Sequence, residues 1–107
     1  MRLLALLTAV LIGTVALCAP PQASHADYDP LYGLRQCESG NDYSINTGNG
    51  YYGGYQFSLR TWRAVGGEGY PHLASPEEQD MRAWHLLTHY GSQHWPVCRY
   101  RLEAGLI

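Results

Sequence analysis

The first residues of this chain form a long apolar run that limits how much of the sequence can fold as a domain. Residues 3–19 are apolar or small without interruption, with an arginine before them and two prolines directly after them. Ser24-His25-Ala26 then places small residues at the two positions that a signal peptidase reads before its cut. We therefore expect residues 1–26 to be a secretory signal peptide and residues 27–107 to be one small exported domain.

Two alternative interpretations of this run are a membrane anchor and a lipoprotein signal. An uncleaved anchor is compatible with the length of residues 3–19, which lies at the lower limit for a membrane-spanning helix. Lipid attachment at Cys18 would follow Leu17, at a position that normally holds a smaller residue. The prolines and the cleavage motif favour a cleaved signal. The predicted location is therefore outside the cell, without stable membrane association.

The charge of the chain argues against several classes of partner. Seven arginines, no lysine and nine acidic residues give a net charge of −2. A polybasic surface for nucleic acid is therefore not expected. The chain is also too short for a doubly wound nucleotide-binding fold, and we expect a monomer.

Cys37 and Cys98 are the two cysteines that follow the predicted signal peptide. In an exported protein such a pair is most simply interpreted as one disulfide. The bond would close a loop of 62 residues (98 − 37 + 1) and would stabilise the fold by about 4 kcal/mol in the chain-entropy model. A domain this small buries a limited apolar core, so this contribution is a large one.

Capping residues predict three helices. The first begins at Asp29-Pro30 and ends at Gly40, the second begins at Ser58 and ends at Gly66-Gly67, and the third begins at Ser75-Pro76 and ends at Gly91. In the third helix, Ser75 and Glu78 have the spacing of a capping box. The inward-facing residues predicted from spacing are Leu31, Leu34 and Cys37 in the first helix and Met81, Trp84, Leu87 and Tyr90 in the third.

The segment 46–56 is rich in glycine and tyrosine and is not expected to be helical. Its Asn49-Gly50 pair is a strong signal for a β-hairpin turn. With the three helices, this hairpin predicts an α+β domain that is mostly helical.

Glu38 is the first candidate for chemistry. It lies near the end of the first predicted helix, beside Cys37 and shortly before the Gly-Tyr segment. A carboxyl held against apolar neighbours has a raised pKa and can act as a general acid, whereas a solvated surface glutamate is the alternative.

Exposed aromatic rings beside glycines make a flat surface that suits sugar rings. Such a surface could come from Tyr51, Tyr52, Tyr55 and Trp62, with Asn46, Gln56 and Thr61 as hydrogen-bonding partners. The competing interpretation places some of these aromatic side chains, together with Trp84, in the core, and we expect this of Trp62, Trp84 and Tyr52. A single acid beside a sugar-binding groove suggests cleavage of a glycosidic bond.

Two motifs are matched only superficially. Gly48, Gly50 and Gly53 have the spacing of a dinucleotide fingerprint but lack the strand-helix-strand context. His85 and His89 have the spacing of a zinc pair, but Leu86 stands where the metalloprotease motif needs glutamate. We therefore expect no cofactor and no metal.

Longer motifs make the chain resemble the resuscitation-promoting factor family over residues 28–100. They include Cys37-Glu38-Ser39-Gly40, Ser44-Ile45-Asn46-Thr47-Gly48-Asn49-Gly50-Tyr51-Tyr52-Gly53-Gly54, Gln56-Phe57-Ser58, Thr61-Trp62-Arg63-Ala64-Val65-Gly66-Gly67, Gly69-Tyr70-Pro71-His72 and Trp95-Pro96-Val97-Cys98. The resemblance implies a small lysozyme-like domain that is secreted or in the cell wall and acts on peptidoglycan, cutting between N-acetylmuramic acid and N-acetylglucosamine. It also implies Glu38 as the catalytic acid, a Cys37–Cys98 disulfide, and substrate contacts by Thr61, Gln56 and the Tyr51-Tyr52 hairpin.

The chain departs from the family pattern at Asp42-Tyr43, where the family usually has Asn-Trp. If Asp42 approached Glu38, the like charges would raise the pKa of Glu38 further. A single carboxylate suits a lytic transglycosylase, because ordinary glycosidases use two. Hydrolysis by a water positioned without a second carboxylate is the competing reaction, and the sequence leaves both open. A non-catalytic wall-binding or signalling module is the rival function, and a wall peptidase is a possible partner of such proteins.

Overall fold

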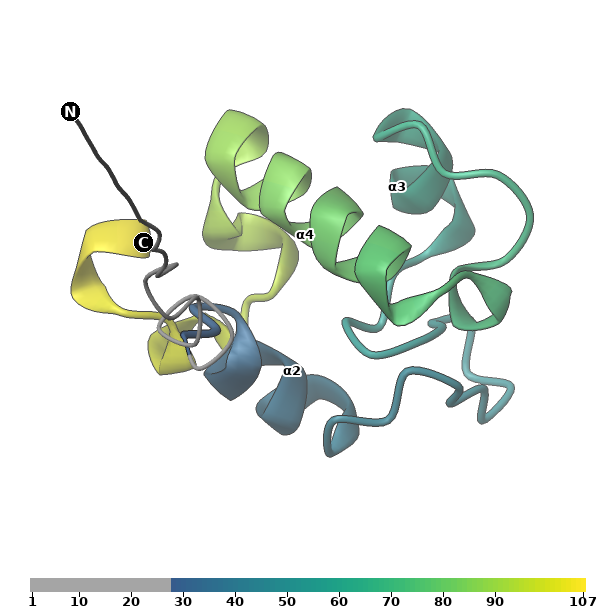
Figure 1. Ribbon diagram of the computed structural model, residues 1–107, viewed down its shortest axis with the longest axis horizontal. Coiled ribbons are helices and arrows are strands. Elements are labelled where there is room, and N and C mark those ends of the chain that lie inside the picture. The colour runs from purple at the N-terminus through teal and green to yellow at the C-terminus, as the bar shows by residue number, and fades with distance from the viewer. Residues whose placement is uncertain (1–27) are drawn as a thin grey trace, which may run out of the picture.

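Figure 1 shows the computed structural model, which describes residues 28–107. The predicted signal peptide lies outside the described residues. The described part contains three α-helices, α2 (Tyr32–Ser39), α3 (Leu59–Ala64) and α4 (Pro76–Tyr90). In Figure 1 the long α4 runs across the molecule, with α2 on one side of it and α3 on the other. Four short 3-10 helices complete the fold: η1 (Pro71–Leu73), η2 (Ser92–His94), η3 (Arg99–Arg101) and η4 (Ala104–Leu106). The predicted mostly helical class is confirmed.

The helix ends follow the capping residues in most places. Ser58 and Ser75 each accept a hydrogen bond from the backbone N–H three residues later, at 3.1 Å, as predicted. Gly40 ends α2 in the left-handed conformation (φ 69), which glycine adopts without strain. The Glu78 carboxylate, in contrast, pairs with Arg82 at 3.3 Å. Only the Ser75 part of the capping box is therefore seen.

The start of α2 differs from the prediction. The helix begins at Tyr32, and its N-cap residue is Leu31. Asp29 still accepts a hydrogen bond from the Leu31 N–H at 3.1 Å, but its other carboxylate oxygen pairs with Arg35. The carboxylate of Asp29 is thus shared between the backbone and a buried arginine. Asp29 lies in the turn just before the helix and does not cap it.

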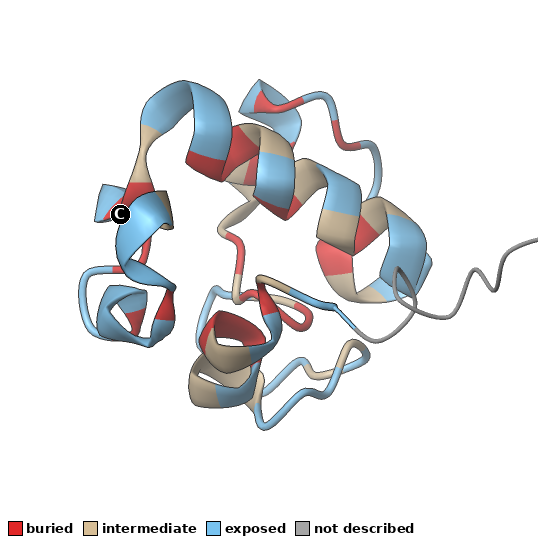
Figure 2. Cartoon of the chain, turned by 60° about the vertical axis from the view of Figure 1, so that its left-hand side comes forward, coloured by how far each residue is buried: buried red, intermediate tan, exposed pale blue. Residues whose placement is uncertain are grey.

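The apolar core lies between the helices and the Gly-Tyr segment, where the buried positions are red in Figure 2. Its buried members are Leu31, Leu34, Tyr55, Phe57, Trp62, Val65, Ala83, Leu86, Leu87, Trp95, Cys98 and Leu102. Leu31 and Leu34 of α2 are buried as predicted, and Cys37 packs against this core.

The predicted inner face of α4 is wrong for three of its four residues. Leu87 is buried, but Met81, Trp84 and Tyr90 are 55%, 42% and 54% exposed. The positions of α4 that face inward are Gln79, Ala83, Leu86 and Leu87. Two of these four residues are not large and apolar: Ala83 is small, and Gln79 hydrogen-bonds to loop backbone. A pattern that looks for large apolar residues therefore misplaces this face.

The predicted hairpin is reduced to two isolated antiparallel bridges. Tyr52 pairs with Asn46 on one side and with Phe57 on the other, and the described residues contain no longer strand. Asn49-Gly50 lies inside the first of these turns, where Asn49 accepts a hydrogen bond from the Tyr51 N–H at 3.0 Å. The glycine-rich chain makes close turns here and leaves little length for a ladder.

None of the helices within residues 28–107 combines the length and the hydropathy needed to cross a bilayer. The same residues contain no group of three or more metal-ligating side chains. The rings of His85 and His89 stack on each other at 4.1 Å on α4.

Candidate active site

Glu38 lies in the last turn of α2 and is half-buried. Burial raises the pKa of its carboxyl, because the charged form loses solvation. The carboxyl of Asp42 accepts hydrogen bonds from the Ser44 N–H at 2.9 Å and the Ser44 hydroxyl at 2.7 Å. The raised pKa of Glu38 therefore has burial, and not repulsion by Asp42, as its cause.

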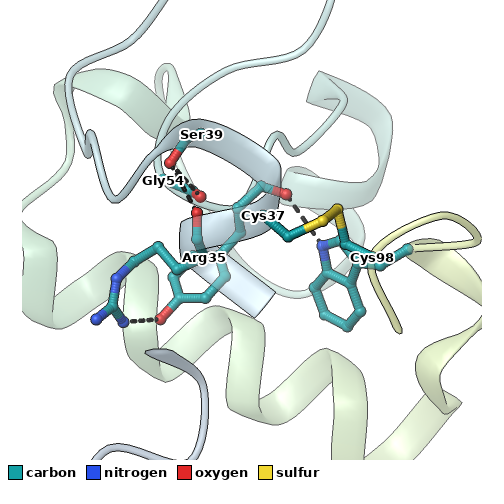
Figure 3. The surroundings of a disulfide bond; sticks show 7 residues. Arg35, Cys37, Ser39, Gly54 and Cys98 are labelled. Carbon is teal, nitrogen blue, oxygen red and sulfur yellow. Dashed lines mark hydrogen bonds between the residues drawn. A yellow bond between two sulfur atoms is a disulfide. The ribbon is translucent and has the colours of Figure 1, made fainter. Parts of the chain in front are cut away.

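The residues directly before and after Glu38 are both bonded to other parts of the fold. Cys37 forms the predicted disulfide with Cys98, with 5.7 Å between their Cα atoms. The Ser39 hydroxyl contacts the carbonyl oxygen of Gly54 at 2.8 Å, which ties α2 to the Gly-Tyr segment (Figure 3). The Glu38 backbone is thus held between a covalent bond and a hydrogen bond to a second segment.

One turn earlier, Arg35 joins the same helix to three other parts of the fold. Its guanidinium is buried and pairs with Asp29 and Asp80, the latter at 3.3 Å. It also donates a hydrogen bond to the hydroxyl of buried Tyr55 at 2.8 Å (Figure 3). Burial and the bond to Asp80 raise the pKa of Tyr55, so this phenol stays neutral. These contacts fix the orientation of α2 and hence of Glu38.

Glu38 lines the largest of three adjoining cavities. This cavity of about 370 Å³ is also bordered by Cys37, Cys98, Asn49, Tyr51, Gln56, His94, Pro96 and Val97. A small cavity of about 40 Å³ shares Tyr51, Gln56 and His94 with it and reaches Thr61. A third cavity, of about 250 Å³, shares Thr61 and His94 with the small one. Because they share wall residues, the three cavities adjoin, and we refer to them together as the groove.

Three of the substrate-binding residues expected from the sequence lie with Glu38 in this groove. They are Tyr51, Gln56 and Thr61. Tyr51 is 50% exposed, as a ring that contacts a ligand would be. Gln56 has a left-handed backbone (φ 54), which is uncommon for a residue with a side chain, and it lies in the close turn between Tyr52 and Phe57. Backbone strain of this kind is frequent at functional sites.

The other expected contacts lie elsewhere. The Asn46 side chain is exposed and accepts a hydrogen bond from the Gly48 N–H at 3.1 Å, so it shapes the loop. Tyr52 stacks on His72 at 5.4 Å, and neither it nor Asn46 borders the three cavities. Tyr55 and Trp62 are fully buried, which corrects their assignment to a sugar-binding surface and confirms the core role of Trp62.

His94 is the residue that the sequence analysis missed, and it borders all three cavities. Pro96 and Val97 were also missed, and they line the cavity that holds Glu38. The predicted Cys37–Cys98 disulfide was the available signal, because it must bring the residues just before Cys98 against Glu38. Among the described residues that border the groove, Glu38 is the only carboxylate.

Comparison with known proteins shows which family the chain belongs to. The model of the transglycosylase-like domain matches residues 22–98. The chain is 51% identical over 88 residues to the resuscitation-promoting factor Rpf of Micrococcus luteus, which covers 82% of this chain and 39% of the relative. It is 49% identical over 81 residues to RpfE of Mycobacterium tuberculosis, covering 76% of this chain and 45% of the relative. The chain belongs to the resuscitation-promoting factor family.

A further relative in the family is RpfC of Mycobacterium tuberculosis, with 42% identity over 86 residues, or 79% of this chain and 61% of the relative. The chain thus spans about half the length of the resuscitation-promoting factors it matches. The predicted family is confirmed, and with it the small lysozyme-like fold class.

Proposed function

We propose that this chain is an exported enzyme that cleaves the glycan strands of peptidoglycan, with Glu38 as its single general acid. The observation that carries the proposal is the half-buried Glu38 carboxyl on the wall of a groove in which no other described residue contributes a carboxylate. The relatives named as resuscitation-promoting factors support a role in cell-wall remodelling and resuscitation from dormancy.

The proposed reaction is that of a lytic transglycosylase at the β-1,4 bond between N-acetylmuramic acid and N-acetylglucosamine. Glu38 donates its proton to the glycosidic oxygen as the bond to the muramyl C1 breaks, and the N-acetylglucosamine end leaves as an alcohol. The Glu38 carboxylate then takes the proton of the muramyl 6-hydroxyl as that oxygen bonds to C1. The product is a 1,6-anhydromuramyl end, no water is consumed, and the acid is regenerated.

The raised pKa of Glu38 suits both steps. A carboxyl that holds its proton closer to neutral pH is a better acid at that pH, and its conjugate base is correspondingly stronger. Hydrolysis would need a second group to position water, and ordinary glycosidases use a second carboxylate for this. The side chains of Tyr51, Gln56 and Thr61 are proposed to hold the sugars along the groove.

The test replaces Glu38 by glutamine and follows the digestion of purified peptidoglycan by mass spectrometry. Glu38→Gln keeps the shape of the side chain but removes its proton, so we expect the cleavage rate to fall by roughly 10²–10⁴-fold. Glu68→Gln is the matched control, since Glu68 is exposed and does not border the groove. Circular dichroism verifies that both variants are folded.

The products distinguish the proposal from its rivals. Anhydromuramyl ends from the wild type, lost in Glu38→Gln alone, support the transglycosylase. Reducing muramyl ends would identify a hydrolase and overturn the proposed second step. Unchanged glycan with retained wall binding would identify a non-catalytic module and overturn the proposal. Addition of a wall peptidase to the wild-type reaction tests whether such a partner increases the release of fragments.

A further inference from the structure

The cavity beyond Thr61 has a chemistry different from that of the Glu38 cavity. Its volume is about 250 Å³, and α3 and α4 form most of its wall. Ala64, Val65 and Leu86 give it an apolar floor, and Val65 and Leu86 are buried in the core beneath it. The ring of Tyr90 borders one side and is 54% exposed. We call this cavity the α3–α4 pocket.

Arg60 introduces the only guanidinium among the described residues that border the groove. It is exposed, and the ion pairs within residues 28–107 do not include it. Arg35 and Arg82, in contrast, are paired with carboxylates of the fold. The guanidinium of Arg60 is therefore available to an anionic ligand, and arginine suits a carboxylate because it can donate two parallel hydrogen bonds.

An apolar floor with one cation at its edge matches one part of a peptidoglycan strand. The two sugars of the strand differ by the lactyl branch on the 3-oxygen of muramic acid. That branch has a methyl group and a carboxyl group, and the carboxyl is either free or joined to a peptide that brings further methyl groups and carboxylates. The shared chemistry is a small apolar group followed by a carboxylate.

We propose that the α3–α4 pocket binds the lactyl branch of a muramyl residue and that Arg60 pairs with a carboxylate of that branch. The proposal rests on the proposed function, since it assumes a peptidoglycan strand in the groove. The apolar floor contacts the methyl group, and Arg60 contacts the carboxylate. The small cavity at Thr61 shares wall residues with this pocket and with the Glu38 cavity, and the proposal places one strand across all three. The pocket thus distinguishes muramyl from glucosaminyl residues at a place separate from the acid.

The test measures binding in a chain that carries Glu38→Gln, so that the ligand stays intact during calorimetry. Three ligands of equal length are compared: a glucosaminyl-muramyl oligomer with peptides, the same oligomer without peptides, and an oligomer of N-acetylglucosamine alone. We expect Arg60→Gln to weaken binding of a muramyl oligomer about tenfold, the effect of losing one charged hydrogen bond, and to leave the glucosaminyl oligomer unchanged.

Two further variants keep the test specific. Arg63→Gln is the matched control, since Arg63 is an exposed arginine of the same helix that does not border the pocket. It should change no affinity. Ala64→Leu fills the floor of the pocket without changing charge, and it should weaken muramyl binding selectively.

The outcomes separate the source of the carboxylate. A loss in Arg60→Gln for the peptide-free oligomer assigns the contact to the lactyl carboxylate itself, whereas a loss confined to the peptide-bearing oligomer assigns it to the peptide. Either result supports the proposal. An equal loss for all three ligands, or no loss for any, would overturn it.

The proposal and the proposed function fail separately. A wild-type chain that cleaves peptidoglycan but binds muramyl and glucosaminyl oligomers alike would keep the function and remove the pocket assignment. A chain that cleaves nothing but shows the muramyl preference, with its loss in Arg60→Gln, would keep the pocket and remove the enzyme.

Discussion

The helices α2 and α4 differ in how they are held in the fold. The short α2 is fixed by directed contacts: a disulfide at Cys37, the Ser39–Gly54 hydrogen bond and the ion pairs of the buried Arg35. The longer α4 shares the Arg35–Asp80 pair and hydrogen-bonds through Gln79, but most of its inner face is apolar, and its outer face carries large apolar side chains into solvent. Directed contacts define one orientation, whereas apolar packing tolerates small shifts. The short helix that carries Glu38 is thus the one that depends more on directed contacts.

The largest effect is expected from removing the covalent contact of α2. In the double variant Cys37→Ser, Cys98→Ser, the free energy of unfolding should fall by about 4 kcal/mol, because the unfolded chain regains the freedom of a 62-residue loop (98 − 37 + 1). Urea denaturation with and without a reductant measures this loss. The reductant should lower the wild type toward the variant and leave the variant unchanged. A wild type insensitive to the reductant would contradict this account.

The next effect concerns the directed contacts that α4 makes through Gln79. Gln79 is fully buried; it accepts the Gly54 N–H at 2.9 Å and donates to the carbonyl oxygens of Tyr43 and Ala74, each at 3.0 Å. Gln79→Leu keeps the volume but leaves these three backbone groups without their partner. We expect a loss of about 3 kcal/mol in the free energy of unfolding.

Gln36→Leu is the control for that change, because Gln36 is exposed on α2. Its effect should stay within about 0.5 kcal/mol. If Gln79→Leu and Gln36→Leu lowered the free energy of unfolding equally, the hydrogen bonds of Gln79 would contribute no more to stability than an exposed position does. Denaturation at neutral pH gives both values.

These contacts explain which parts of the structure the sequence could predict. Local signals were sufficient for the caps at Ser58 and Ser75 and for the end of α2 at Gly40, since each depends on neighbouring residues alone. The pairing of Cys37 with Cys98 followed from their number. Gln79 could not be found in this way, because its partners come from loops that only the folded chain brings to it.

The site shows the same limit. Glu38 was identified by its motif, and Tyr51, Gln56 and Thr61 border the same groove. His94 and Arg60 are part of that groove through packing of distant segments, for which no local pattern exists. Hydrophobic periodicity assigns large apolar residues to the inner face of a helix, so it does not find Gln79 or Ala83 there. The predicted inner face of α4 was therefore wrong at Met81, Trp84 and Tyr90.

A smaller effect is expected from the charge of Glu38 itself. Burial raises the pKa of this carboxyl above 4.5, so the folded state binds its proton more tightly than the unfolded state. The resulting stabilisation is complete below pH 4.5 and is lost as the pH rises through the folded-state pKa. Glu38→Gln should therefore melt above the wild type at pH 7, by less than about 5 °C, with the two curves converging toward pH 4.

Thermal melts of Glu68→Gln at the same two pH values provide the comparison, since that exposed carboxyl lies outside the groove. A wild type that is more stable than Glu38→Gln at pH 7 would mean that the carboxylate is stabilised in the fold. That result would contradict a pKa raised by burial, and with it this basis for Glu38 as the general acid.

The smallest effect is expected on the outer face of α4, where the sequence pattern and the structure disagree. Met81 and Leu87 belong to the same predicted stripe, yet Met81 is 55% exposed and Leu87 is 5% exposed. Leu87→Ala is the buried comparison; it removes core volume and should cost at least about 2 kcal/mol. Met81→Ala should change the free energy of unfolding by no more than about 0.5 kcal/mol. Truncation of this exposed side chain removes little buried apolar contact, and alanine favours the helix. Equal costs at the two positions would mean that α4 is rotated, and that Gln79 and Ala83 do not face the core. Since Gln79 holds the loop of Gly54, to which Ser39 binds, such a rotation would also remove the support of Glu38.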